Sequence, residues 1–106
     1  MELTDIEQKP GCLQTTLTIL GEKWTALILR DLSISPKTFS NLEKGLAGIS
    51  PRTLSQRLNK LELEGIISKS IYCQRPPRFE YILTEKGEAL KNVLTSMADW
   101  GAKYCP

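Results

Sequence analysis

The sequence contains no histidine, and this absence removes several kinds of catalytic and metal site. Without imidazole, the chain cannot form a Ser-His or Cys-His nucleophile pair or a histidine-based zinc site. Its three cysteines, Cys12, Cys73 and Cys105, form no Cys-x-x-Cys unit, and an odd number of them does not suit a disulfide scaffold. A glycine-rich phosphate loop is absent too. We therefore expect a protein that is not an enzyme and that uses no cofactor and no metal.

Long apolar runs are also missing. The longest, residues 26–29, has four residues, whereas a membrane-spanning helix needs about 20. The first five residues include two acids and no base, which is the opposite of a secretory signal. With 106 residues, 41% of them hydrophobic, the chain suffices for one hydrophobic core. We expect a single domain over residues 1–106, located in the cytoplasm and without a membrane partner.

The charge is distributed unevenly along the chain, although the net charge is only +2. Residues 36–80 contain eight cations and four anions, while the flanking segments are mildly acidic. Such a basic middle indicates a surface that faces a polyanion. On charge alone, an ordinary surface of solvated lysine and arginine side chains explains the pattern equally well.

The first part of the chain has the apolar spacing of helices. Residues 1–11 end in Pro-Gly and are expected to form a loose N-terminal arm. Leucines at i, i+4 and i+7 then predict a short helix that ends at Gly21. The same spacing from Trp24 onward predicts a second helix, which Ser35-Pro36 ends.

Two further helices have recognisable start signals. Residues 40–43, Ser-Asn-Leu-Glu, match a capping box in which the serine would cap a helix that ends near Lys44. Ser50-Pro51 then provides an N-cap serine and a proline at the first helical position. Leucines 54, 58 and 61 form the stripe that this helix buries, and Gly65 ends it.

The pattern then changes from helical to strand-like. Residues 66–73 and 79–83 are rich in β-branched and aromatic residues, which predicts an antiparallel hairpin. Between them, residues 74–78 contain two prolines and are expected to form a stiff loop outside the strands. Thr84 caps a last helix over residues 84–104. The predicted fold is mainly α (α+β): a winged helix-turn-helix with a two-stranded β-hairpin wing and a C-terminal dimerisation helix.

The recognition helix, residues 51–64, has a polar side that suits DNA. Opposite its leucine stripe lie Arg52, Gln56 and Asn59, and acidic residues are few there. Arginine and glutamine pair with the edges of guanine and adenine, while serine, threonine and lysine suit phosphates. Arg75 and Arg78 of the predicted loop would reach a minor groove or flanking phosphates. The predicted DNA-binding residues are Ser50, Arg52, Thr53, Ser55, Gln56, Arg57, Lys60, Arg75 and Arg78.

The last helix carries a wide apolar stripe. The earlier helices and the hairpin already form a compact unit, so this stripe needs another surface to cover it. We expect a second copy of the chain to do so, although packing on its own domain is the simpler alternative. The predicted dimer interface consists of Leu90, Val93, Leu94, Met97, Trp100 and Tyr104.

Several joined motifs resemble the HxlR-type winged helix-turn-helix regulators over about residues 12–101. They are Gly-Glu-Lys-Trp at 21–24, Phe-Ser-Asn-Leu at 39–42, Gly-Ile-Ser-Pro-Arg-Thr-Leu-Ser-Gln-Arg-Leu at 48–58 and Pro-Pro-Arg-Phe-Glu-Tyr at 76–81. The resemblance implies a homodimeric DNA-binding transcription factor of a bacterium or archaeon, with terminal helices in the dimer interface. It does not distinguish a repressor from an activator, and it identifies no effector.

The sequence departs from the family pattern at two places. Glu22 stands where the family commonly has a second glycine, and we expect it to affect only the turn before Trp24. In redox-responsive members, a cysteine just before the first helix senses oxidants or electrophiles. Cys12 lies one residue after the corresponding position, and the resemblance makes it the candidate redox residue.

The resulting hypothesis is a sequence-specific transcriptional regulator whose partners are double-stranded DNA and a second copy of itself. As a homodimer, it would read an inverted repeat through the recognition helix and the basic wing, with a redox or electrophile response at Cys12. The alternative is a winged-helix module that binds another protein without specific DNA binding. Leu63, an apolar residue on the outer side of the recognition helix, is its main support.

Overall fold

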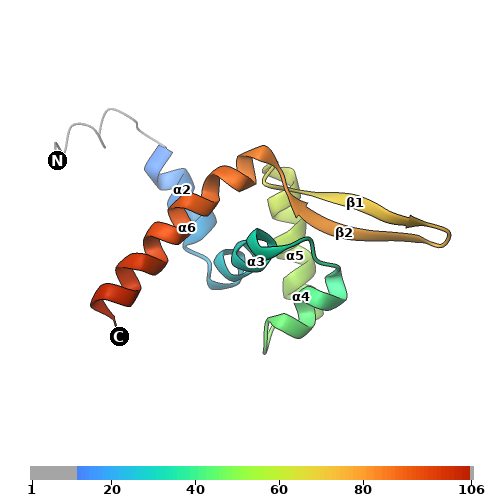
Figure 1. The fold of residues 1–106 in the computed structure, drawn as a ribbon, viewed down its shortest axis with the longest axis horizontal. Coiled ribbons are helices and arrows are strands. Elements are labelled where there is room, and N and C mark those ends of the chain that lie inside the picture. Colours follow the sequence, from blue (N-terminus) through green and yellow to red (C-terminus); the bar gives the residue numbers. More distant parts are fainter. Residues whose placement is uncertain (1–11, 106) are drawn as a thin grey trace.

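The computed structural model describes residues 12–105, with side chains from residue 13 onward, and the expected N-terminal arm lies outside this range. The described residues form five helices and one β-hairpin (Figure 1). The elements are α2 (Cys12–Leu20), α3 (Lys23–Ile34), α4 (Phe39–Gly45), α5 (Pro51–Leu63), β1 (Ile67–Gln74), β2 (Pro77–Leu83) and α6 (Glu85–Tyr104).

The core lies where α3, α4 and α5 meet the base of the hairpin. The predicted leucine stripe of α5 is confirmed: Leu54, Leu58 and Leu61 are all buried. They pack with residues of α3 and with Ile66 at the start of the hairpin. Burying this side of α5 leaves its opposite side facing solvent, so the core sets which residues of the helix a partner can reach.

The capping box of α4 is real but begins two residues earlier than the sequence analysis placed it. Thr38, not Ser40, is the N-cap: its Oγ1 accepts a hydrogen bond from the Asn41 backbone N at 3.0 Å. The Asn41 side chain returns the contact by accepting from the Thr38 backbone N at 3.3 Å. The earlier start brings Phe39 into the helix, where it packs against the core. The side chain of Asn41 thus forms the hydrogen bond to the N-cap backbone that Glu43 would form in a capping box over residues 40–43.

The hairpin is longer and its turn is shorter than predicted. The strands are antiparallel, with Ile67 opposite Leu83 at the base and Gln74 opposite Pro77 at the tip. Only Arg75 and Pro76 lie between the strands, so the expectation that residues 74–78 form a loop is wrong. Proline is tolerated at the first position of a strand, which is where Pro77 lies. A bulge between Ile71 and Cys73 shifts the register near the tip.

Two contacts fix α6 relative to the hairpin. Thr84 caps α6 as predicted, because its Oγ1 accepts from the Gly87 backbone N at 3.2 Å. The Thr84 hydroxyl also donates to the Ile66 carbonyl at 3.0 Å. At Gly87 an added Cβ would lie 2.2 Å from the same carbonyl oxygen, so α6 approaches the hairpin this closely only because the residue is glycine.

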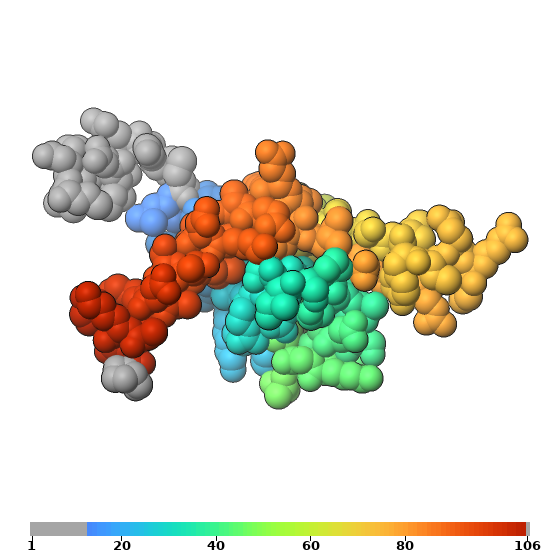
Figure 2. All heavy atoms as spheres, in the orientation of Figure 1, coloured from blue at the N-terminus to red at the C-terminus, as the bar shows by residue number. Residues whose placement is uncertain are grey.

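The hairpin and α6 extend from opposite sides of the body formed by the other helices (Figures 1 and 2). The order of helices, with a short turn before α5 and a hairpin directly after it, is that of a winged helix-turn-helix. The predicted fold class is therefore confirmed. None of the described helices is both long and apolar enough to cross a membrane.

Candidate nucleic-acid interface

The turn before α5 fixes where this helix begins. Gly48 has φ +92°, a left-handed conformation that glycine adopts without strain. Ser50 is the N-cap, as predicted, and its Oγ accepts from the Thr53 backbone N at 3.0 Å. The same oxygen donates to Thr53 Oγ1 at 2.9 Å, so the two predicted phosphate ligands are hydrogen-bonded to each other at the start of α5.

Over its first three turns, the exposed side of α5 is polar and carries no acid. Glu62, the first acidic residue of the helix, lies at its C-terminal end and pairs with Lys69 of β1 at 4.0 Å. The remaining outer side chains form no ion pair or hydrogen bond with other residues of the described chain. We call this set the outer face of α5: Arg52, Ser55, Gln56, Asn59 and Lys60, all of them exposed.

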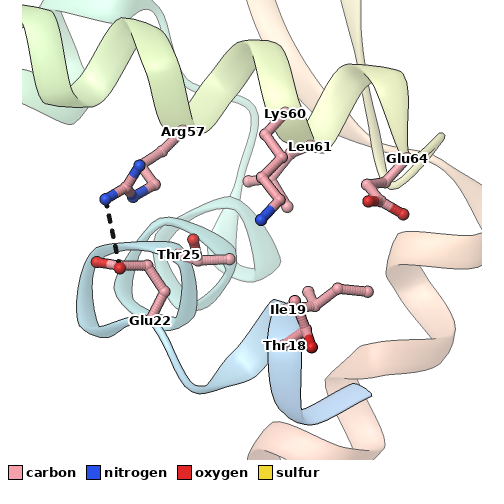
Figure 3. Close-up of a pocket in the computed structure, with 8 residues that line it drawn as sticks. All are labelled: Thr18, Ile19, Glu22, Thr25, Arg57, Lys60, Leu61 and Glu64. Carbon is pink, nitrogen blue, oxygen red and sulfur yellow. Dashed lines mark ion pairs between the residues drawn. The ribbon is translucent and has the colours of Figure 1, made fainter. Parts of the chain in front are cut away.

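Arg57 differs from the other predicted DNA-binding residues because it turns toward the body. Its Nη2 lies 3.3 Å from Glu22 Oε2, at the start of α3 (Figure 3). Its side chain is 28% exposed, and its Nε is buried without a hydrogen-bond partner. The expectation that Glu22 affects only the turn before Trp24 is therefore wrong, since its carboxylate joins the recognition helix to α3.

The hairpin presents the two predicted wing arginines in different settings. Arg75 is exposed in the two-residue turn at the tip. Arg78 is also exposed, but it lies within β2 opposite Cys73 rather than in the loop. The strand therefore fixes the backbone of Arg78, while Arg75 is held only by the turn.

The base of the wing is tied to the helical body through Tyr81. Its backbone exchanges two hydrogen bonds with Lys37 in the segment between α3 and α4, at 2.7 and 3.1 Å. Burial, and after it the carboxylate of Glu62, raises the pKa of Tyr81 above the ordinary 10.0. The phenol is therefore neutral at physiological pH, and the wing leaves the body from a fixed, buried anchor.

The residues predicted for the dimer interface divide into two groups. Leu90 and Leu94 are partly buried against the core of their own chain. The other four form what we call the apolar face of α6: Val93, Met97, Trp100 and Tyr104, which are 39–61% exposed. A hollow of 420 Å³ lies along this face. The rings of Trp100 and Tyr104 lie 5.3 Å apart, centroid to centroid.

Other apolar and sulfur-containing residues bear on the predictions. Leu13 and Leu17 of α2 are about half exposed, so only Leu20 of the predicted stripe is buried. Leu63 is 89% exposed, and α6 does not cover it.

Cys12 is the first residue of α2, but its side chain lies outside the described part of the structure, so the redox assignment is not tested.

Comparison with known proteins identifies the family of this winged helix-turn-helix. The family model described as HxlR-like helix-turn-helix matches residues 19–106. The HTH-type transcriptional regulator YdeP of Bacillus subtilis is 42% identical over 95 residues, covering 89% of this chain and 74% of YdeP. The chain belongs to the HxlR-like helix-turn-helix family, and it is a DNA-binding transcriptional regulator.

Solved structures agree with the assignment. The reduced form of the regulator YodB from B. subtilis has a TM-score of 0.81 and 32% identity, over 90% of this chain and 93% of YodB. The oxidised form of the redox regulator HypR has a TM-score of 0.79 and 31% identity, over 89% of this chain and 97% of HypR. The predicted family resemblance is thus confirmed.

Proposed function

We propose that the protein binds an inverted-repeat operator as a homodimer, with α5 in the major groove and the hairpin beside it. The observation that carries this proposal is the outer face of α5, which is exposed, polar and free of acidic residues next to a projecting basic wing. Arg52 and Gln56 would read base edges, since both side chains are exposed and unengaged. Ser55, Lys60 and the α5 N-terminal pair Ser50 and Thr53 would contact the phosphate backbone.

In this proposal Arg57 has a different role from the other DNA-binding residues. Its ion pair with Glu22 holds the flank of α5 against α3, so it positions the helix rather than reading a base. Arg75 and Arg78 would contact phosphates or the minor groove from the wing. Both are exposed, and no ion pair within the described residues neutralises them.

A second copy of the chain is the proposed occupant of the apolar face of α6. Trp100, Met97 and Tyr104 are more than half exposed, which is costly for large apolar side chains clustered on one helix. A dimer would place two copies of α5 about one DNA turn apart, ~34 Å, and let each half-site add its binding energy. The exposed Leu13 and Leu17 of α2 would extend the same interface.

The proposal includes a redox or electrophile response at Cys12. Two structural relatives bear on it: HypR, which is named a redox regulator, and YodB, whose structure is known in a reduced and a diamide-treated form. Cys12 is the first residue of α2, the helix that carries the exposed Leu13 and Leu17. Oxidation of the Cys12 thiol, or its reaction with an electrophile, would therefore take place beside the proposed dimer interface.

The test is fluorescence anisotropy of the reduced protein on its own upstream DNA and on a scrambled duplex, titrated with salt. We expect a preference of ~10³-fold or more for the upstream duplex and a log–log salt slope of several units. After treatment with diamide the wild type should change its affinity, and a Cys12→Ser variant should not.

Equal, weak binding to both duplexes would call for a selection from random duplexes. If that selection yields no preferred sequence, the operator proposal is wrong. The exposed Leu63 would then favour the alternative hypothesis of a winged-helix module that binds another protein, through this end of α5.

A further inference from the structure

A pocket of 260 Å³ lies behind the recognition helix, between α2, α3 and α5 (Figure 3). It lies beside the outer face of α5 and shares Lys60 with it, while its other walls come from the flank of α5 and from the two helices that support it. Its size, just below that of pockets for drug-sized molecules, suits a small organic compound. The lining residues are Thr18, Ile19, Glu22, Thr25, Arg57, Lys60, Leu61 and Glu64.

Three hydrogen-bond donors in this pocket have no partner among the described residues. Thr25 is 95% buried, yet its hydroxyl, which faces the pocket in Figure 3, forms no hydrogen bond. Arg57 Nε is buried and unpaired. Lys60 Nζ forms no ion pair and is directed from α5 toward α2 and α3 in the same view. The cost of an unmet hydrogen bond falls on Arg57 Nε, since it is the buried one, whereas solvent reaches the other two donors. An anionic acceptor would satisfy all three.

The other lining groups limit what the ligand can be. Glu22 already pairs with Arg57. The carboxylate of Glu64 forms no ion pair within residues 13–105 and lies farther along the pocket, where it would repel a second negative charge. Ile19 and Leu61 provide apolar wall between the two ends. A single anionic group on a short apolar body fits this arrangement, and a multiply charged anion does not.

We propose that this pocket binds a small organic monocarboxylate. Its carboxylate accepts hydrogen bonds from Thr25 Oγ1, Arg57 Nε and Lys60 Nζ. Its apolar body lies against Ile19 and Leu61.

The ligand acts on DNA binding, a step that rests on the proposed function of α5. Lys60 and Arg57 belong to the recognition helix, and Lys60 is a proposed phosphate contact. A bound carboxylate engages Lys60 from behind and adds a negative charge next to α5. Both effects oppose binding to the phosphate backbone, and losing one contact lowers the log–log salt slope by about one unit.

The test uses benzoate as the probe, with the full chain in the absence of DNA. Calorimetry measures affinity, and amide NMR shifts locate the site. We expect saturable binding that shifts the amides of Ile19, Thr25 and Leu61, with weaker binding of neutral benzyl alcohol and of dianionic phthalate. Thr25→Val, which retains the shape of the side chain, should weaken benzoate binding about tenfold.

Lys60→Met provides a second variant at an exposed position that leaves the core intact, and it should also weaken binding. Lys44→Met, at an exposed lysine of α4 outside the pocket, is the matched control and should bind benzoate as the wild type does. The proposal is overturned if the wild type binds benzyl alcohol as tightly as benzoate, or if it shows no saturable binding of benzoate. It is also overturned if Thr25→Val and Lys60→Met bind benzoate with the affinity of the wild type.

The DNA step is tested separately by repeating the operator titration with saturating benzoate. Lower affinity and a smaller salt slope support the coupling, and an unchanged titration overturns it. If benzoate binds the pocket but the protein shows no preference for any duplex, the carboxylate site stands and the operator proposal fails.

Discussion

At the scale of single residues, two arginines of α5 show what a helical projection can and cannot predict. Arg52 was placed opposite the leucine stripe, and the structure exposes it there. Arg57 is also among the predicted DNA-binding residues, yet its guanidinium pairs with Glu22 at the start of α3. A projection gives the angle of a side chain around its own helix. It does not give the partner that another helix supplies.

Replacing Arg52 or Gln56 with alanine tests the base contacts. Each variant should lose about 1–3 kcal/mol of binding free energy on the operator and almost none on a random duplex, because a bidentate base contact exists only at the correct sequence. Anisotropy titrations on both duplexes measure the difference. Arg30→Ala, at an exposed arginine of α3 outside the outer face of α5, is the matched control. Equal losses on both duplexes would assign the residue to the phosphate backbone instead.

At the scale of elements, the sequence predicted, in order, every helix and the hairpin that the structure describes over residues 12–105, because their signals are local. Periodic leucines, Ser50-Pro51 and Thr84 each act within one or two turns of their own position. The errors occurred where two local signals compete. Thr38 with Asn41 and Ser40 with Glu43 both match a capping box, and the helix uses the pair that brings Phe39 into contact with the core. Likewise, Pro77 fits both a loop and the first position of a strand.

The wing offers an element-scale prediction. Arg75→Ala should weaken binding to all duplexes by a similar factor and reduce the log–log salt slope by about one unit, because a phosphate contact carries no sequence information. Salt titrations on operator and random DNA measure both quantities. Arg30→Ala, at the exposed arginine of α3 used above, removes one charge of the same sign outside the hairpin and serves as the control. A loss confined to the operator would show that Arg75 reads sequence in the groove.

At the scale of the whole molecule, the sequence predicted an apolar stripe on α6 but could not show which of its residues are buried and which are exposed. Leu90 and Leu94 pack against the core, whereas Val93, Met97, Trp100 and Tyr104 remain exposed. The division depends on the angle at which α6 leaves the hairpin, and that angle is set by the close approach of Gly87 to Ile66. No periodicity in α6 encodes this contact. The pocket behind α5 was missed for the same reason, because its walls come from three separate helices.

The exposed half of the stripe gives the last prediction. Trp100→Glu should destabilise the dimer by at least about 2 kcal/mol, because it places a charge at the centre of the apolar face of α6. Sedimentation or light scattering should then find a mass near that of one chain, at concentrations where the wild type is a dimer. Ile34→Glu is the matched control, since Ile34 is 75% exposed but lies at the end of α3 rather than on that face.

Loss of the dimer should also change how the protein reads DNA. The Trp100→Glu variant should bind an inverted repeat no more tightly than a single half-site, because the two recognition helices are no longer linked. The wild type and Ile34→Glu should both prefer the full repeat. If Trp100→Glu retains the mass of a dimer and the preference for the repeat, the second copy uses a different surface. The exposed leucines of α2 would then be the next residues to replace.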